Sequence, residues 1–221
     1  MAKTVEALIQ LAESQLGYDR YQDPLPGTVY GRWYADLTNS PWFGTTGVPF
    51  CAMFASWCLY KLGIPCIGTP TASCTSGLLT AARSAGKLLR VENGARGDLI
   101  LFNWNKAGYY ASEADHVGII TSNSGATIQT IEGNVDGGKV LRRTRYPSEV
   151  VGCIRPAFEE EQPMAFKDVY KSTPHYQDIV WMKEKGIAKG YPDGTYRPDA
   201  ALTRGDAAAF LHRLYNVIEG K

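Results

Sequence analysis

One apolar segment constrains the fold of this 221-residue chain more than any other feature. The residues from Phe50 to Leu62 are apolar almost all round a helical wheel, and Gly63 follows them. A helix without a polar face is stable only when neighbours cover it on every side. The segment is also shorter than the about 20 apolar residues that span a bilayer. It therefore predicts a helix at the centre of a globular core.

Helical and strand patterns follow one another along residues 1–157. Apolar residues recur at helical spacing from Val5 to Leu16, and a further helix is expected over about 75–85. Residues 18–47 show no clear period and are expected to be irregular. Helices followed by an antiparallel run of strands predict an α+β fold. The expected strands are Asp98–Asn103, His116–Thr121, Thr127–Glu132, Val140–Tyr146 and Val150–Arg155.

The chain divides near residue 160, where Glu159-Glu160-Glu161-Gln162-Pro163 forms an acidic stretch that ends in proline. We expect one domain over residues 1–157, a linker over 158–164 and a small module over 165–221. The sequence of this module predicts two helices joined by a loop. Thr203 is expected to cap the second helix, because Asp206 follows three residues later.

Charge and composition exclude several classes of protein. A formal net charge of +1 argues against electrostatic binding of nucleic acid or of an anionic membrane. The N-terminus lacks the apolar core of a signal peptide, so we expect synthesis in the cytoplasm without an export signal. Five cysteines, an odd number, predict free thiols. With three dispersed histidines, we expect neither a metal site nor a cofactor.

One cysteine has the position of a nucleophile. Cys51 opens the apolar helix directly after a proline-containing turn, and the partial positive charge of a helix N-terminus favours a thiolate. Cys58 and Cys153 are expected to fill the core, and Cys66 and Cys74 lack an obvious helix start before them. A cysteine in a helix is more often a small buried hydrophobe, so Cys51 alone does not establish an enzyme.

His116 is the single histidine of the first 157 residues, so a cysteine–histidine enzyme would have to use it as the base. Glu132 and Asn134 are two residues apart in the next strand, so they point to one face, and either could orient the imidazole. The alternatives are a capping or surface histidine and a simple turn at residues 132–134. Only the combination favours catalysis.

Aromatic side chains gather ahead of Cys51. Tyr34 and Trp42 are candidates for contacting a glycan or peptide substrate. The alternative is that these rings pack over the start of the helix. The other aromatic residues of this stretch are Tyr30, Trp33 and Phe43.

Three strings in residues 5–157 resemble the CHAP family of cysteine- and histidine-dependent amidohydrolases and peptidases. The resemblance implies a papain-like α+β fold that cleaves amide bonds in peptidoglycan, with Cys51 as nucleophile, His116 as base, and Glu132 and Asn134 as orienting groups. Some relatives bind calcium through an Asp-x-Asp loop, but only Asp36 stands in the corresponding stretch, so we expect no calcium. The strings are Pro49–Trp57, Gly97–Phe102, and Asp115–Ile120 with Ile131–Asn134 behind it.

The second half resembles one S-layer homology (SLH) repeat. The resemblance implies attachment to a secondary cell-wall polymer, with Trp181 and Arg204 as the binding candidates. Relatives usually carry three repeats where this chain has one, so we expect a homotrimer that rebuilds the missing groove. The matching strings are Phe166–Val169, Gly186–Pro198 and Leu202–Ala208.

Together the two resemblances imply a peptidoglycan hydrolase of the phage endolysin type, targeted to the wall by its second half and acting there after release from the host cytoplasm. We favour an N-acetylmuramoyl-L-alanine amidase. The alternatives are an endopeptidase of the stem or cross-bridge, a general cysteine peptidase, and a wall-binding protein whose first half is inert. None of these requires a cofactor, a nucleic acid or a membrane.

Overall fold

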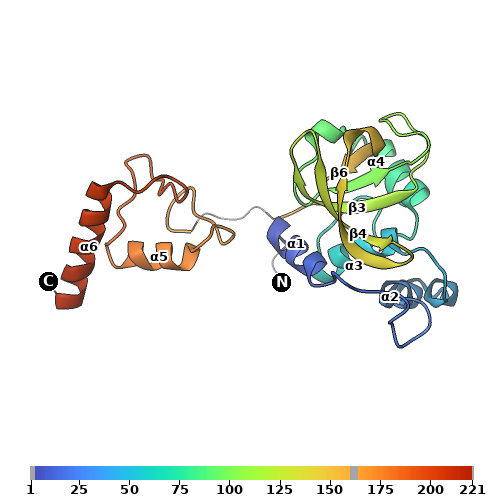
Figure 1. Cartoon of the computed structure of the whole chain (residues 1–221), viewed down its shortest axis with the longest axis horizontal. Helices are drawn as coiled ribbons and strands as arrows, with labels where there is room; N and C mark the ends of the chain where they lie inside the picture. Colours follow the sequence, from blue (N-terminus) through green and yellow to red (C-terminus); the bar gives the residue numbers. More distant parts are fainter. Residues whose placement is uncertain (1–2, 160–163, 221) are drawn as a thin grey trace. The chain divides into compact units, whose positions relative to one another are not determined.

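A computed structural model describes residues 3–159 and 164–220 of the chain. These residues form two compact units, Met1–Glu159 and Glu160–Lys221 (Figure 1). Residues 160–163 of the expected linker lie outside the described residues. Within the described part of the chain, every helix is too short or too polar to cross a membrane.

The first unit is built on an antiparallel sheet of six strands in the order β1-β6-β2-β3-β4-β5. Together with the helices that accompany it, this sheet confirms the predicted α+β class. The five expected strands are present, and the two-residue strand β1 is an addition that the sequence did not predict. The strands are β1 Leu88–Leu89, β2 Leu99–Phe102, β3 His116–Asn123, β4 Ile128–Val135, β5 Lys139–Arg145 and β6 Val150–Ile154.

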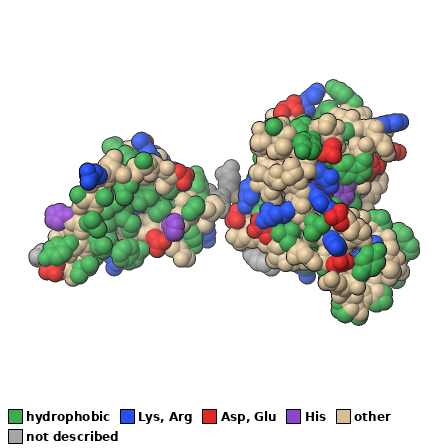
Figure 2. Space-filling model, in the orientation of Figure 1, with side chains coloured by type: hydrophobic (Ala, Val, Ile, Leu, Met, Phe, Trp, Pro, Cys, Tyr) green, Lys and Arg blue, Asp and Glu red, His purple; other side chains and the backbone are tan. Residues whose placement is uncertain are grey.

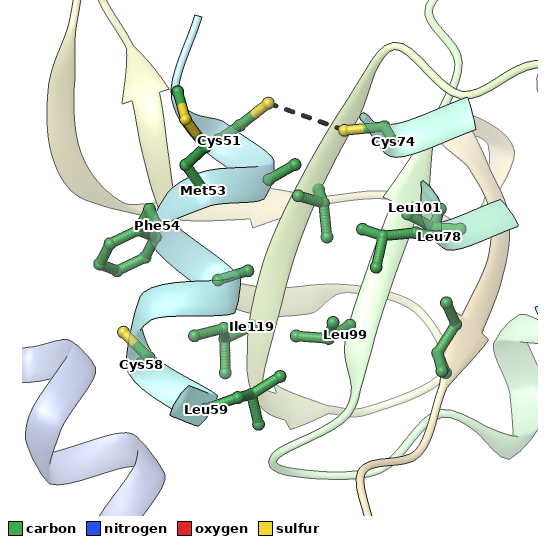
Figure 3. Packing of buried hydrophobic residues seen from close by; sticks show 14 of the residues in the cluster. Cys51, Met53, Phe54, Cys58, Leu59, Cys74, Leu78, Leu99, Leu101 and Ile119 are labelled. Atoms are coloured by element: carbon green, nitrogen blue, oxygen red, sulfur yellow. Dashed lines mark hydrogen bonds between the residues drawn. The ribbon is translucent and has the colours of Figure 1, made fainter. Parts of the chain in front are cut away.

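Helix α3 is the central helix that the apolar segment predicts. It begins at Cys51 and ends at Leu62, and Gly63 closes it in the left-handed conformation with φ 65°. Figure 3 shows Leu59 of α3 next to Ile119 of the sheet, in a cluster of buried residues that also contains Cys58 and Leu99. Helix α1, Val5–Glu13, packs on α3, and α3 packs on β3 and β4. The start of α3 is thereby fixed relative to the start of β3.

Residues 18–47 are more regular than expected, because they contain helix α2, Val29–Thr38, and the short helix η1, Pro41–Gly44. The Thr28 hydroxyl caps α2 by accepting from the Gly31 amide at 2.9 Å, and Asn39 ends it with φ 52°. Tyr30 of α2 is fully buried in the core. Thr28 and Asn39 are residue types that typically cap a helix, but the many aromatic residues between them hid the helical period.

The helix expected over about 75–85 begins one residue earlier and in an unexpected form. The segment η2, Cys74–Leu79, is a turn of π-helix that continues directly into α4, Thr80–Ser84. The Ser73 hydroxyl caps its start by accepting from the Ser76 amide. Two further short helices are η3 Val91–Asn93 and η4 Pro147–Glu149.

The second unit has the helix–loop–helix order that its sequence predicts. Helix α5 covers Tyr176–Glu184 and helix α6 covers Arg204–Glu219, with Thr203 as the expected cap of α6. Its small core contains Phe166, which stacks on Tyr196 with ring centroids 5.3 Å apart. No residue of α6 is buried within this unit, and Figure 2 shows hydrophobic side chains gathered on the unit's surface.

Candidate active site

Cys51 lies at the first position of α3, where its thiol meets two partners. Its Sγ is 3.7 Å from the Sγ of Cys74 (Figure 3), and it also interacts with the imidazole of His116. A hydrogen bond from Cys74 and the hydrogen bond and charge of His116 outweigh the effect of burial, so the pKa of the Cys51 thiol lies well below its usual value. The partners of Cys51 therefore favour its thiolate form.

His116 is the first residue of β3 and is buried. Its Nε2 lies 2.9 Å from Oε2 of Glu132, and the imidazole also interacts with the Cys51 thiol. Burial lowers the pKa of His116, but the hydrogen bonds to Cys51 and Glu132 outweigh burial and raise it to about 9. The surroundings therefore favour a protonated imidazole beside the Cys51 thiol.

Glu132 is a fully buried carboxylate that stays charged. Its Oε1 accepts from Thr130 Oγ1 at 2.5 Å and from Arg145 Nε at 2.8 Å, and its Oε2 accepts from Arg145 Nη2 at 2.6 Å. Burial acts to raise the pKa of Glu132, but these bonds and the one to His116 lower it to about 2. The carboxylate consequently holds the imidazole in one orientation.

Gly118 makes room for this carboxylate. A Cβ at position 118 would lie 2.7 Å from Cγ of Glu132 and 3.4 Å from its Cδ. The side chain of Glu132 therefore passes over the bare backbone of β3 on its way to His116. The glycine two residues after His116 thus has a steric purpose in the site.

Asn134 is placed differently from Glu132. The register between β4 and β5 shifts between Glu132 and Val135, and Asn134 has φ 60°, so the two-residue alternation of the strand ends there. Its Oδ1 accepts from Arg20 Nη2 at 2.8 Å, and the same guanidinium donates to the Val48 carbonyl at 2.9 Å. The structure thus brings Asn134 to the segment that leads into α3 and brings Glu132 to His116.

Cys74, Arg145 and Trp104 lie around the site and were not predicted as site residues. Cys74 is the first residue of η2, and no helix start was predicted there. Ser73, whose side chain caps η2, is the local sequence signal for this start. Arg145 lies with its Cζ 4.6 Å from the centroid of Trp104, a half-exposed ring 5.9 Å from the His116 ring. The contact of Arg145 with this ring depends on how the strands pair, which carries no local sequence signal.

The remaining cysteines differ from Cys51 in their surroundings. Cys58 and Cys153 are buried in the core, as expected, and burial raises the pKa of both thiols, that of Cys153 to about 12. Cys66 is more exposed, yet burial still raises its pKa to about 12. Only at Cys51 do the described partners favour the thiolate.

The aromatic candidates are divided between the core and the surface. Tyr30 stacks on Phe50 in the core, with ring centroids 5.3 Å apart. Tyr34 is half-buried and meets Phe43 edge to face at 4.8 Å, whereas Trp42 is 63% exposed. Of these rings, Trp42 presents the largest surface to a ligand.

The second unit exposes both of its sequence candidates. Trp181 lies on α5 and is 45% exposed, and Arg204 is the exposed first residue of α6. A separate cavity of about 440 Å³ lies in this unit, and neither Trp181 nor Arg204 is among its lining residues. Its lining includes Lys189, Arg197 and Arg213 together with aromatic rings.

The geometry of the first unit supports nucleophilic chemistry. A thiol whose surroundings favour the thiolate lies at a helix start, beside an imidazole that a buried carboxylate orients. Such a set can attack a carbonyl carbon and then protonate the leaving group. Among the described residues, no cluster of three or more metal-ligating side chains is present.

Comparison with known proteins gives two family matches. The family model of the CHAP domain matches residues 43–134, and that of the S-layer homology domain matches residues 165–208. The solved structure of Ly7917 is 15% identical, with 70% of this chain and 63% of Ly7917 covered and a TM-score of 0.42. That of PlyC is 20% identical, with 70% and 36% covered and a TM-score of 0.31. This chain thus aligns with less than two thirds of either protein.

A comparison with curated proteins gave no match. The matched CHAP segment contains Cys51, His116, Glu132 and Asn134, and the matched SLH segment contains Trp181 and Arg204. Both resemblances noted in the sequence are therefore confirmed. Residues 43–134 thus match the CHAP domain, and residues 165–208, further along the chain, match the S-layer homology domain.

Proposed function

We propose that this protein is a peptidoglycan hydrolase that cleaves an amide bond with Cys51 as nucleophile and His116 as its acid–base partner. The observation that carries the proposal is the buried chain of contacts from the Cys51 thiol through His116 to Glu132. The CHAP match supplies the class of substrate, because members of that family act on peptidoglycan. Neither the bond that is cut nor the mechanism follows from the match itself.

The reaction begins with attack of the Cys51 thiolate on the amide carbonyl. The negative oxygen of the tetrahedral intermediate is stabilised by the Cys51 backbone N–H at the start of α3. When the intermediate collapses, the C–N bond breaks and His116 gives its proton to the departing amine. His116 then accepts a proton from water, which hydrolyses the thioester and releases Cys51.

The other site residues position this pair. Glu132 keeps the imidazole oriented and favours its protonated form. Asn134 acts through Arg20, which joins it to the segment that leads into Cys51. Trp42 and Tyr34 contact the glycan or peptide next to the scissile bond.

Our preferred substrate bond is the one between N-acetylmuramic acid and L-alanine. Mass spectrometry of digested, purified peptidoglycan tests this preference. An amidase releases stem peptides with a free alanine amino terminus and leaves peptide-free glycan. A free amino terminus elsewhere in the stem or cross-bridge would identify an endopeptidase. Products that carry new reducing sugar ends, without new amino groups, would overturn the proposal.

The second unit targets the hydrolase to a secondary cell-wall polymer. Trp181 and Arg204 carry this binding in our proposal, since both are exposed and lie within the SLH match. The enzyme is made in the host cytoplasm and reaches the wall after release. Linking a catalyst to a polymer-binding unit raises its effective concentration on the wall.

An exposed apolar stripe on helix α6 is the surface through which we propose that the chain forms a homotrimer. Leu211, Tyr215 and Ile218 are spaced to form one stripe, and they are 66%, 52% and 72% exposed. Assembly of three copies would cover this stripe. Sedimentation velocity tests the idea: we expect a trimer for the full chain and a monomer for Leu211→Glu. A monomeric wild type at working concentration would refute it.

A further inference from the structure

Cys51 and Cys74 form a pair of thiols whose proximity the hydrolytic mechanism does not use. Their sulfurs are 3.7 Å apart, and Figure 3 shows the two side chains pointing toward one another. Both thiols are free, and the residues are 6% and 7% exposed. One comes from the start of α3 and the other from the start of η2, so only the fold brings them together.

The segment that carries Cys74 is tied down on two sides. The Thr71 amide donates to Ser56 Oγ of α3 at 2.9 Å, and this hydroxyl donates back to the Thr71 carbonyl at 3.2 Å. Thr75 Oγ1 donates to the Ala114 carbonyl at 3.0 Å and accepts from the Ala114 amide at 2.9 Å. The contact between the sulfurs is therefore a built feature of the site.

We infer that Cys51 and Cys74 form a reversible disulfide when the protein meets a peroxide, so that position 74 is a modification site that protects the nucleophile and switches it off. The disulfide itself follows from the position of the two thiols. The loss of activity rests on the proposed function of Cys51.

The chemistry proceeds in two balanced steps. The Cys51 thiolate attacks one oxygen of hydrogen peroxide and the O–O bond breaks, which gives a sulfenic acid at Cys51 and hydroxide. The sulfur loses two electrons and the peroxide gains them. The Cys74 sulfur then attacks the sulfenic sulfur, the S–S bond forms as the S–O bond breaks, and the Cys74 proton leaves with the hydroxide as water.

The electrostatics support this order of events. The pKa of the Cys74 thiol is raised, first by its hydrogen bond to Cys51 and then by burial, so Cys74 stays protonated while Cys51 is a thiolate. Once Cys51 is oxidised to the neutral sulfenic acid, Cys74 no longer donates a hydrogen bond to a thiolate. A disulfide is about 2.05 Å long, so the sulfurs then need to approach by roughly 1.7 Å.

The other thiols provide the contrast. Cys66 is the least buried of the five cysteines, but its pKa of about 12 keeps it protonated and unreactive toward peroxide. Cys58 and Cys153 are buried, with pKa values that burial also raises. Oxidation should therefore begin at Cys51 although its sulfur is not the most exposed.

Intact-mass measurement of the full chain after mild hydrogen peroxide treatment tests the inference. We expect a loss of two hydrogen atoms that dithiothreitol reverses, and peptide mapping without reduction should link the peptides of Cys51 and Cys74. A sulfinic acid at Cys51 without any linked peptide, or a link from Cys51 to another cysteine, would overturn the inference. These readouts remain decisive even if the protein is not a hydrolase.

Two variants complete the test, each normalised to its own activity before peroxide. Cys74→Ser leaves the sulfenic acid without a partner, so Cys51 should proceed to sulfinic acid and dithiothreitol should restore little activity. Cys66→Ala is the matched control and should recover as wild type does. Equal recovery of wild type and Cys74→Ser would contradict the protective role of position 74.

Discussion

A thiolate at position 51 depends on the groups that surround it. Burial alone would keep the Cys51 thiol protonated, as it does for Cys58 two turns further along the same helix. The difference comes from Cys74 and His116, and His116 in turn depends on Glu132. At the scale of single residues, each ionisable group of the site shifts the pKa of its neighbour.

This chain predicts a pH profile of hydrolysis. The active form has an ionised Cys51 and a protonated His116, so kcat/KM should fall on the alkaline side as His116 loses its proton near its pKa of about 9. Because Glu132 helps to raise that pKa, Glu132→Gln should move the alkaline fall to lower pH and reduce kcat by roughly 10²-fold or more. A fall at unchanged pH in the variant would separate Glu132 from His116.

The same groups link stability to pH. The pKa of Glu132 is about 2 in the folded protein and 4.5 ordinarily, so its contribution is complete above 4.5 and is lost as the pH falls toward 2. The pKa of His116 is about 9 against 6.5, so its contribution is complete below 6.5 and is lost as the pH rises toward 9.

Urea unfolding of the full chain at a series of pH values should therefore show this contribution at its largest between about 4.5 and 6.5. Glu132→Gln should flatten the acid side of the curve. Glu13→Gln, which changes only a surface ion pair with Arg142, should leave that side unchanged and is the matched control. An acid slope that survives in Glu132→Gln would show that other carboxylates cause it.

At the scale of elements, the site depends on close approach of strand to strand. Gly118→Ala would place a methyl group 2.7 Å from Glu132 Cγ and push the carboxylate away from His116. We expect a loss of about 1–3 kcal/mol in the free energy of unfolding and a lower activity. Gly44→Ala, whose nearest contact would be 3.6 Å, is the control and should behave as wild type. Full activity in Gly118→Ala would show that Glu132 is not needed beside the imidazole.

The sequence predicted those elements whose signals are local. The apolar run with its glycine gave α3, and Thr203 with Asp206 gave the start of α6. The helix that begins at Val29 was not predicted, because its aromatic residues masked the helical period. The contact of Arg145 with Glu132 was not predicted for another reason, since Arg145 reaches the carboxylate only through the pairing of β4 with β5. Positions set by strand register cannot be obtained from spacing along one chain.

At the scale of the whole molecule, the proposed function assigns cleavage to the first unit and wall binding to the second. Trp181→Ala or Arg204→Ala in the full chain should weaken co-sedimentation with intact cell walls and slow their lysis. Digestion of soluble peptidoglycan fragments should continue at the wild-type rate, because the effective-concentration advantage applies only to the insoluble polymer. Lys185→Ala, an exposed change just after α5, is the control. Unchanged wall binding in both variants would move the polymer site elsewhere, with the cavity around Arg213 as the next candidate.

The release of amino groups from purified peptidoglycan by wild type, Cys51→Ala and Cys58→Ala tests the central claim most directly. Both substitutions remove a buried thiol from α3, but only the first removes the sulfur that meets His116. Cys51→Ala should lose activity by roughly 10³-fold or more, whereas Cys58→Ala should retain a rate of the wild-type order. Equal rates for wild type and Cys51→Ala would contradict nucleophilic catalysis by Cys51. Inactivity of all three proteins toward walls that the second unit binds would instead favour a wall-binding protein with an inert first unit.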